Sequence, residues 1–295
     1  MSAYNGEKYL AQQIDSILAQ EKVEVSLLVR DDGSWDATPK LLKDYACRYE
    51  NVCVYYGEHV GTQKSYFDLL SYADTKQDYY AFSDQDDVWC AGKLWRAVKL
   101  LEQEDCGPRR ARLYASGVFC ASEDLSVKKQ LRCRIRKQPS FGNALVENLC
   151  MGCTEVFNVR LLELVKAHPP SCGIFHDWWV YMTAAYFGTV VFDCHAFILY
   201  RQHGQNQVGV QDNQIEKWKN RMTRFRELRG LVSRQAADFA NVYKDMHRKR
   251  PELELAIAYR GQIMKRLRIV FGHTVYRQGC LDQFIYRLLF ASGFL

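Results

Sequence analysis

Apolar residues in the first 212 positions alternate between short continuous runs and stripes with helical spacing. Leu10, Ile14 and Ile17 fall on one face of a helix expected over residues 7–20, and Asn5 is placed to cap it. Further apolar runs predict strands at residues 25–29, 52–56, 79–82 and 192–199. This rhythm is typical of an α/β fold with a mostly parallel, Rossmann-like sheet flanked by helices.

The pattern changes to helices only from residue 213 onward. Trp218, Phe225, Val232, Phe239 and Met246 recur every seven residues, which predicts a long amphipathic helix or hairpin with a break at Gly230. Residues 263–271 and 284–295 mix apolar and aromatic side chains with basic ones. Such helices either cover the α/β body or lie in a bilayer interface. We expect a body over residues 1–212 and a basic helical C-terminal region over residues 213–295.

Charge separates these two regions more clearly than the total of +6 suggests. Residues 213–295 carry 17 Lys and Arg against 7 Asp and Glu, a net charge of +10, whereas residues 1–212 carry 23 against 27, a net charge of −4. The basic region predicts an anionic partner, either a membrane surface or a nucleic acid. Because the sequence offers neither an 18-residue apolar run nor a secretory signal, we expect a cytoplasmic protein.

Eleven cysteines are scattered through the chain and are expected to be free thiols. Cys150 and Cys153 have the CxxC spacing of zinc and redox sites. No second pair or nearby His completes a tetrahedral set, so this pair is expected to serve packing.

Two acidic clusters follow predicted strands. Asp31 and Asp32 come after the strand at residues 25–29, and Asp84, Asp86 and Asp87 after the strand at residues 79–82. In open α/β sheets ligands bind at the carboxyl ends of strands. Two carboxylates on one tight turn can hold a divalent cation that in turn binds a diphosphate. Each cluster is also compatible with an ordinary turn, but two on one sheet edge favour a site.

Two further polar groups lie in the second half of the body. The first is Asp177, set among aromatic residues in the sequence HDWW, where a partly buried base would be held. The second is YRQHG, which ends the predicted strand at residues 192–199 and contains His203. A lone His is usually structural, but imidazole can complete an Asp-bound metal site.

The ordered set YNGEKYLAQQIDSILAQ, VRDDGSWDAT, FSDQDDVW, NLCMGCTEVFN, HDWW and YRQHGQN resembles the family-2 glycosyltransferases, and most of all their bacterial rhamnosyltransferase branch. The match covers about residues 2–210. It implies a GT-A fold, a nucleotide-diphosphate sugar donor, a divalent metal (Mn²⁺ or Mg²⁺) and an inverting transfer.

The resemblance also implies roles for individual residues on the donor side. Tyr4 matches the aromatic residue that packs against the donor base, and Asp32 matches the residue that binds that base. Lys64 lies where the family often places a basic contact to the donor. Asp84 matches the carboxylate near the donor ribose and the metal.

The same resemblance implies the metal ligands, the base and the acceptor side. Asp86 matches the carboxylate that coordinates the metal, and His203 matches a third metal or diphosphate contact. Asp177 matches the catalytic base, which would take a proton from an acceptor hydroxyl in a single displacement. The positions that shape the acceptor side are Gly152, Cys153, Thr154, Trp178 and Trp179.

The resemblance further implies transfer of one or a few sugars, possible donors including dTDP-rhamnose, to a cell-surface glycan or a polyprenyl-diphosphate-linked acceptor. Polymerisation is not expected, because the Gln-x-x-Arg-Trp segment of processive synthases is absent. Rossmann dehydrogenases and Walker-type NTPases are excluded by the lack of their glycine motifs, and no nucleic-acid module is recognisable.

One departure from the family concerns the N-terminus. Family members usually carry an apolar strand directly before the SAYN-like segment, whereas this sequence starts at Met1. We expect a form with that upstream strand to be more soluble and more active. The alternative function is a catalytically impaired GT-A-like protein that serves as a membrane- or glycan-binding module.

Overall fold

The computed structural model describes residues 1–104, 107, 110–204, 229–246 and 250–295. The chain divides into two compact units. The first unit consists of Met1–Arg134, Cys150–Ala167 and Phe175–Gln207, and the second of Ile135–Leu149, His168–Ile174 and Val208–Leu295. The predicted boundary after residue 212 lies outside the described residues, as do Trp218 and Phe225 of the seven-residue repeat.

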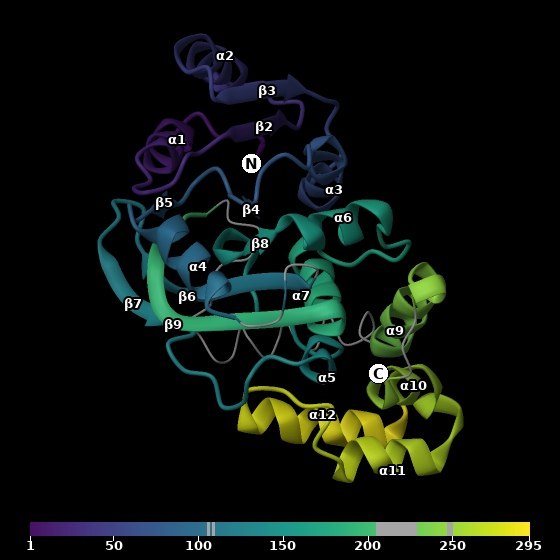
Figure 1. Ribbon diagram of the computed structural model, residues 1–295. Coiled ribbons are helices and arrows are strands. Elements are labelled where there is room, and N and C mark those ends of the chain that lie inside the picture. Colours follow the sequence, from purple (N-terminus) through teal and green to yellow (C-terminus); the bar gives the residue numbers. More distant parts are fainter. Residues whose placement is uncertain (105–106, 108–109, 205–228, 247–249) are drawn as a thin grey trace. The chain divides into compact units, whose positions relative to one another are not determined.

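The first unit opens with a three-stranded parallel sheet in the order β1–β2–β3. Its elements are β1 (Ser2–Ala3), α1 (Leu10–Leu18), β2 (Leu27–Asp31), α2 (Thr38–Arg48) and β3 (Val52–Tyr56). The strands are parallel because a helix returns the chain after each strand. Figure 1 shows β2 and β3 side by side, with α2 beyond β3.

The N-terminal segment supplies a short strand, and the predicted cap of α1 is wrong. Ser2 and Ala3 pair with Arg30 and Asp31 of β2. Asn5 adopts a left-handed conformation with φ of 48°, and its side-chain oxygen accepts a hydrogen bond from the backbone N–H of Trp35. Asn5 therefore joins two turns at the sheet edge, and α1 starts only at Leu10, after a turn of residues 6–9.

The second sheet has six strands and is mixed. Its order is β4–β8–β6–β9–β5, with β7 paired to β6, and only β6 and β9 run parallel to each other. The mostly parallel arrangement predicted for the body holds for the whole first sheet and, in the second, for β6 and β9 only, because β6 and β7 form a hairpin and no helix separates β4 from β5. The strands are β4 (Tyr79–Ala81), β5 (Val88–Trp89), β6 (Ala111–Ala121), β7 (Val127–Leu131), β8 (Val156–Asn158) and β9 (Gly188–Arg201).

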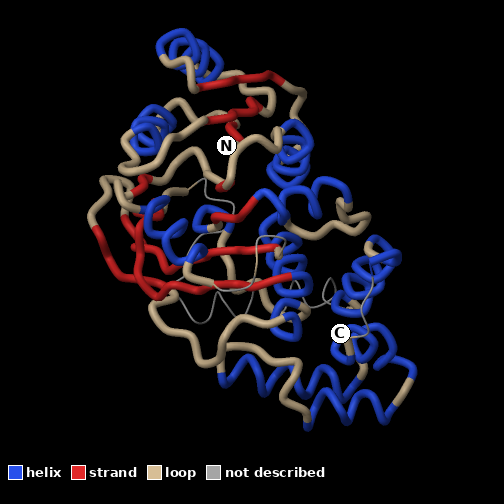
Figure 2. Tube along the Cα trace, in the orientation of Figure 1, coloured by secondary structure: helices blue, strands red, loops and turns tan. Residues whose placement is uncertain are grey.

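Strands β6 and β9 form the centre of this sheet, and they lie side by side over most of their length (Figure 2). Gly188 permits their approach, because a Cβ at this position would lie 1.7 Å from the Ala111 carbonyl oxygen. The long helix before β9 is apolar on all sides and mostly buried, as expected of a core helix. The helices that pack against this sheet are α4 (Lys93–Glu102), α6 (Val159–Ala167) and α7 (His176–Phe187), whereas α3 (Thr62–Tyr72) packs against β1 and β2 of the first sheet.

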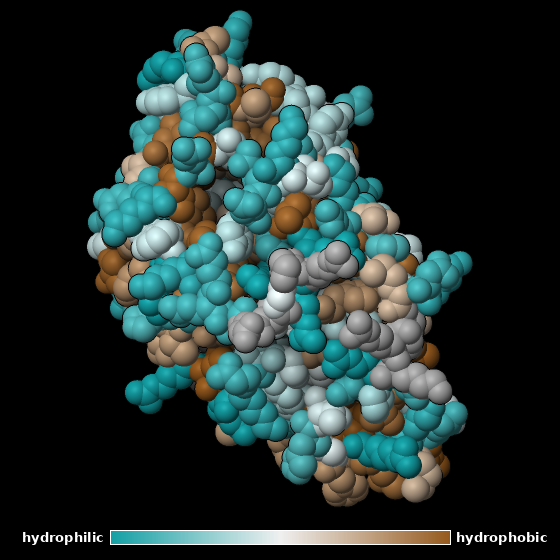
Figure 3. Space-filling model, viewed as in Figure 1, coloured by the Kyte–Doolittle hydropathy of each residue, from teal (hydrophilic) through white to brown (hydrophobic). Residues whose placement is uncertain are grey.

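The second unit is built from helices in its described residues. They are α5 (Phe141–Ala144), α9 (Leu231–Val242), α10 (Pro251–Ala258), α11 (Ile263–Phe271) and α12 (Cys280–Ser292), with 3₁₀ turns at Lys244–Met246 and Tyr259–Gly261. Val232 and Phe239 of the predicted repeat are buried on α9, which begins directly after Gly230. Apolar and polar residues lie side by side over α11 and α12 in Figure 3.

Candidate active site

The first acidic turn follows β2, and its second carboxylate is buried. Asp32 accepts hydrogen bonds from the backbone N–H groups of Val60 (3.0 Å) and Gly61 (2.9 Å). The Arg30 guanidinium also contacts this carboxylate, and His59 Nδ1 lies 2.9 Å from its Oδ2. Asp32 therefore anchors the loop that follows β3 at the carboxyl edge of the first sheet.

Tyr4 connects this first turn with the second one. Its ring stacks on His59 with a centroid separation of 4.1 Å. Its backbone N–H donates to Gln85 Oε1 at 2.7 Å, and Gln85 Nε2 donates back to the Tyr4 carbonyl at 2.9 Å. Lys64 is exposed on the first turn of α3. Tyr4 therefore links Asp32, through His59, to the second acidic turn, through Gln85, at the edge of the sheet.

The second acidic turn, residues 83–87, follows β4. Tyr66 is buried on α3 and donates its hydroxyl to Asp84 Oδ1 at 2.8 Å. Burial and, secondarily, the neighbouring Asp86 carboxylate raise the pKa of Asp84 to about 6. A positive charge that binds beside such a carboxylate stabilises its ionised form.

His203 and Asp86 are brought together across 117 positions of sequence, with His203 Nε2 lying 2.8 Å from Asp86 Oδ2. Arg201, the last residue of β9, supports the same turn from behind. Its Nε donates to the Asp86 carbonyl at 2.8 Å, and its backbone N–H donates to Asp87 Oδ1 at 3.1 Å. The YRQHG segment therefore both positions the acidic turn and contributes an imidazole to it.

Beneath the turn lies a cluster of buried ionisable groups. One ligand atom each of Asp84, Asp87 and Cys153 lies within 4.8 Å of the others. Among the described residues, Asp87 Oδ2 and Lys93 Nζ are buried without a hydrogen-bond partner, and the Lys93 ammonium lies 3.4 Å from the centroid of the Trp89 ring. Burial lowers the pKa of Lys93 to about 7, although the charges of Cys153 and Asp87 favour its protonated form.

The oxygen donors of this cluster fit a divalent cation. A cation would offset the repulsion among the carboxylates and give Asp87 Oδ2 a partner. Cys153 fits less well, since burial and the nearby carboxylates raise the pKa of its thiol and so keep it protonated. Mg²⁺ and Mn²⁺ prefer carboxylate oxygens, and imidazole is an accepted further ligand for transition metals. Asp84 and Asp87 are the carboxylates that this cluster offers to such an ion, and Asp86 and His203, the predicted metal ligands, lie 2.8 Å from each other.

Asp177 lies in the first turn of α7, next to the 3₁₀ turn Gly152–Thr154 (η1). Its Oδ2 accepts a hydrogen bond from the Gly152 backbone N–H at 3.2 Å, and a Cβ on Gly152 would lie 3.3 Å from the Asp177 Cβ. The adjacent His176 is buried and stacks on Tyr66 at 3.8 Å. Because Tyr66 also bonds Asp84, one side chain links the acidic turn to the start of α7.

The residues predicted for the acceptor side differ in exposure. Gly152 and Trp178 are partly exposed beside Asp177. Cys153, Thr154 and Trp179 are buried, so they can act on an acceptor only through packing. Burial chiefly lowers the pKa of His176 to about 3, which keeps its imidazole neutral.

Sequence reasoning missed several residues that organise this site: Arg30, His59, Tyr66, Gln85 and Lys93. Gln85 lies inside the acidic motif and could have been noted as a polar residue facing the sheet edge. Lys93 carried a clearer signal, because it is the first residue of a helix, where the macrodipole disfavours a cation. The other three depend on contacts between distant elements.

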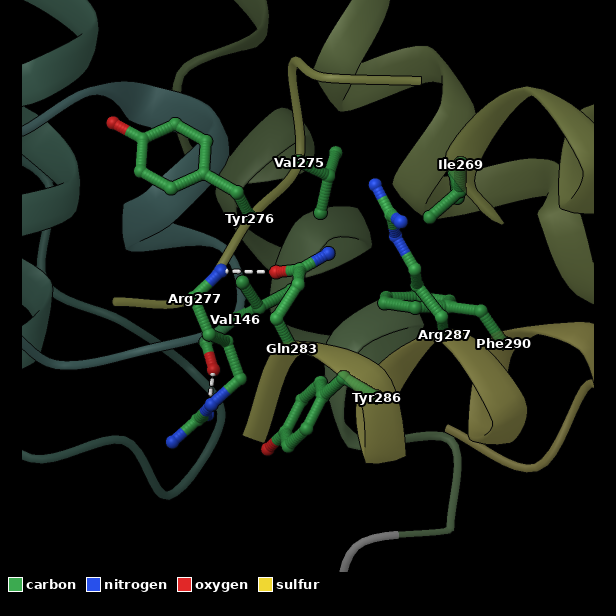
Figure 4. A pocket seen from close by; sticks show the side chains of 9 residues that line it. All are labelled: Val146, Ile269, Val275, Tyr276, Arg277, Gln283, Tyr286, Arg287 and Phe290. Atoms are coloured by element: carbon green, nitrogen blue, oxygen red, sulfur yellow. Dashed lines mark hydrogen bonds between the residues drawn. The ribbon is translucent and has the colours of Figure 1, made fainter. Parts of the chain in front are cut away.

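The second unit contains a small cavity between α11, α12 and residues 275–277 (Figure 4). Val146, Ile269 and Phe290 contribute its apolar walls, and Arg277 and Gln283 are joined there by a hydrogen bond. The cavity has room for about one water molecule (about 10 Å³), so it is far too small for a nucleotide sugar. Among the described residues, no helix has both the length and the apolar character needed to cross a membrane.

Known proteins resemble this chain in sequence. A family model described as glycosyl transferase family 2 matches residues 1–140. The dTDP-rhamnosyl transferase RfbG of Shigella flexneri is 30% identical over 232 residues, which are 74% of this chain and 77% of that protein. The predicted family resemblance is thus confirmed.

Solved structures resemble the chain in fold. TarS residues 1–349 from S. aureus match with a TM-score of 0.55 at 15% identity, over 98% of this chain and 88% of that chain. In a longer TarS structure the match covers 43% of that chain. The mannosyltransferase PcManGT from Pyrobaculum calidifontis, in complex with GDP-Man and Mn²⁺, matches with a TM-score of 0.51 at 17% identity, over 90% of this chain and 69% of that chain. These similarities confirm the GT-A fold, and with the sequence match they show that the chain belongs to glycosyltransferase family 2 and is a glycosyltransferase.

Proposed function

We propose that this protein is an inverting, metal-dependent glycosyltransferase that uses a nucleotide-diphosphate sugar, with dTDP-L-rhamnose as the first donor to test. The observation that carries the proposal is the link through Tyr66, which bonds Asp84 and stacks on His176 beside Asp177. Tyr66 thereby fixes the position of Asp84, the proposed donor-side carboxylate, relative to the helix start that carries Asp177, the proposed acceptor-side carboxylate.

The donor base would lie against Tyr4 and Asp32. The Tyr4 ring is about one-third exposed and already stacked on His59, so a flat base can extend this stack. The loop anchored by Asp32 supplies backbone groups around the same place. Lys64, exposed on α3, supplies a positive charge for the donor phosphates.

Asp84, Asp86 and His203 would hold Mn²⁺ or Mg²⁺ at the acidic turn. When bound, this ion would offset the negative charge that develops on the leaving nucleotide diphosphate. The proposal is supported by the unpartnered oxygen of Asp87 and by the closeness of Asp86 and His203. The Mn²⁺ in the structure of PcManGT points to the same class of cation.

Asp177 would act as the general base. An acceptor hydroxyl loses its proton to the Asp177 carboxylate while its oxygen bonds to the anomeric carbon. The bond from that carbon to the phosphate oxygen breaks at the same time, and the nucleotide diphosphate leaves with the electron pair. Because one displacement occurs, the configuration of the anomeric carbon inverts.

The name of the relative RfbG makes dTDP-rhamnose the first donor to test. The acceptor would be a cell-surface glycan or a polyprenyl-diphosphate-linked glycan, reached from the cytoplasmic side of the membrane. The proposed role is therefore the addition of one or a few sugars in polysaccharide biosynthesis.

Calorimetry with dTDP-, UDP- and GDP-sugars, with and without Mn²⁺, tests the donor half of this proposal. Metal-dependent binding of one nucleotide sugar by the wild type and its loss in Asp86→Ala are expected. Asp78→Ala, which removes an exposed carboxylate near the start of β4, is the matched control and should bind normally. No binding to any donor by folded protein would favour the non-catalytic binding module.

Asp177→Asn tests the acceptor half. The substitution preserves the size of the side chain but removes the basic carboxylate. Donor binding should remain within about twofold of wild type, while transfer to an acceptor glycan falls by about two to four orders of magnitude. Transfer at the wild-type rate would reject Asp177 as the base.

A further inference from the structure

Helices α11 and α12 each expose several large apolar side chains. On α11 these are Ile263, Met264, Leu267 and Phe271, and on α12 they are Leu281, Phe284 and Leu288. We call these seven residues the outer face. Ile263 and Phe271 are 70% and 75% exposed. The spacing within each helix places its members on one side, so the exposure forms two stripes and is not scattered.

The outer face is not left over from an incomplete core. Each helix has a second apolar side that is already buried, represented by Ile269 of α11 and Phe290 of α12. These two residues line the cavity of the second unit together with Val275 (Figure 4). A helix with apolar residues on two opposite sides buries both only if something packs against each side. In the described residues, the side that carries Ile269 or Phe290 is packed and the outer face is not.

The charge around the outer face is predominantly positive. Residues 259–295 contain six Lys and Arg but a single acidic residue, Asp282. Arg266 and Arg287 donate hydrogen bonds to backbone carbonyls. On α11, Arg268 is exposed and lies at the edge of the outer face, whereas Lys265 is half-buried on another side of the helix. A partner of this surface must therefore combine apolar groups with negative charge.

We propose that the outer face of α11 and α12 docks in the interface of an anionic lipid bilayer, with its apolar side chains among the acyl chains and Arg268 at the headgroups. Short amphipathic helices bind bilayers in this way without crossing them. Anionic lipid attracts basic segments electrostatically, by an amount that falls with salt. The docking does not depend on the sugar-transfer reaction.

A second copy of the chain fits this surface less well. A symmetric dimer through the outer face would bring two copies of the same cationic flank together. Like charges at such an interface oppose association, whereas anionic headgroups neutralise them. Charge therefore favours lipid over a second copy.

Vesicle co-sedimentation with the full chain tests the proposal. The probes are phosphatidylcholine vesicles with and without phosphatidylglycerol, at about 50 mM and about 500 mM NaCl. The wild type should sediment with the anionic vesicles at low salt and much less at high salt. Phe271→Ser/Phe284→Ser should weaken this binding about tenfold or more, since it removes two aromatic anchors. Arg268→Gln should weaken it and reduce its salt dependence.

The matched control is Tyr72→Ser/Val127→Ser, which removes two exposed apolar side chains from the first unit and should bind vesicles like the wild type. Far-ultraviolet circular dichroism and melting temperature check that every variant is folded. No binding of the wild type to anionic vesicles at low salt would overturn the proposal, as would unchanged binding by the Phe271→Ser/Phe284→Ser variant.

A dimer in vesicle-free solution that dissociates in the Phe271→Ser/Phe284→Ser variant would also overturn it, in favour of a second copy as the partner. Donor binding, measured separately on the same variants, should remain unchanged. Loss of vesicle binding with normal donor binding thus separates this inference from the proposed function.

Discussion

Lys93 offers a sharp test of the buried cluster beneath the acidic turn. Its side chain is fully buried, and its Nζ has no hydrogen-bond partner among the described residues. Burial lowers its pKa from 10.5 to about 7, against the opposing effect of Cys153 and Asp87. Between these two pH values the unfolded chain binds one proton more than the folded chain at this amine. Stability must therefore rise with pH across this window.

The size of the effect follows from the shift. One extra proton in the unfolded state changes the free energy of unfolding by about 1.4 kcal/mol per pH unit. Between about pH 7.5 and about pH 9, the wild type should gain about 2 kcal/mol relative to Lys93→Met, which has no titrating group. Below the folded pKa, both states of the wild-type amine are protonated and the difference between the two proteins becomes constant.

Urea unfolding of metal-free wild type and Lys93→Met at a series of pH values measures this difference directly. Titrating groups that do not interact with Lys93 behave alike in both proteins, so their effects cancel in the comparison; Asp87 and Cys153, which interact with Lys93, are the exceptions. Lys99→Met, an exposed position on the same helix, is the control and should follow the wild type at every pH. Parallel profiles for wild type and Lys93→Met would show that Lys93 is charged in the folded protein and would refute the reasoning.

Three further predictions concern the sheet edge and the core. His203→Ala removes the imidazole beside Asp86 and should weaken Mn²⁺ binding about 10- to 100-fold by calorimetry, with Asp86→Ala weakening it at least as much. Gln85→Ala breaks both hydrogen bonds to the Tyr4 backbone and should cost about 1 kcal/mol in urea unfolding while raising the donor Kd; an unchanged Kd would separate Tyr4 from the donor site. Gly188→Ala forces a Cβ against the Ala111 carbonyl and should destabilise the fold by more than about 3 kcal/mol, whereas Gly92→Ala has open space and should have little effect on the melting temperature.

Local patterns in the sequence predicted individual elements well where the apolar spacing was regular. The strand expected at residues 52–56 is β3 with the same bounds, and the stretch at residues 263–271 is α11. The positions of both acidic turns at strand ends were also predicted. In each case a period of two or of 3.6 residues, ended by polar residues, is set by neighbours in sequence.

Pairing between distant strands could not be predicted in the same way. The order of strands and helices suggested parallel neighbours, but β8 pairs antiparallel with both β4 and β6. Which strands become neighbours depends on the burial of whole faces, such as that of α7, and no local period records it. For the same reason, the sequence could name His203 as a candidate metal ligand but could not predict its contact with Asp86, which only the fold creates.

Lys93 shows how a local rule that is broken can indicate a site. As the first residue of α4, its ammonium faces the positive end of the helix dipole, and full burial adds a desolvation cost. Asp87 and Cys153 offset only part of these costs, since the pKa of Lys93 still falls to about 7. A residue that destabilises its own helix end is retained more readily where it serves another purpose. Here that purpose would be to set the charge beneath the turn where Asp84 and Asp86 are proposed to hold the metal.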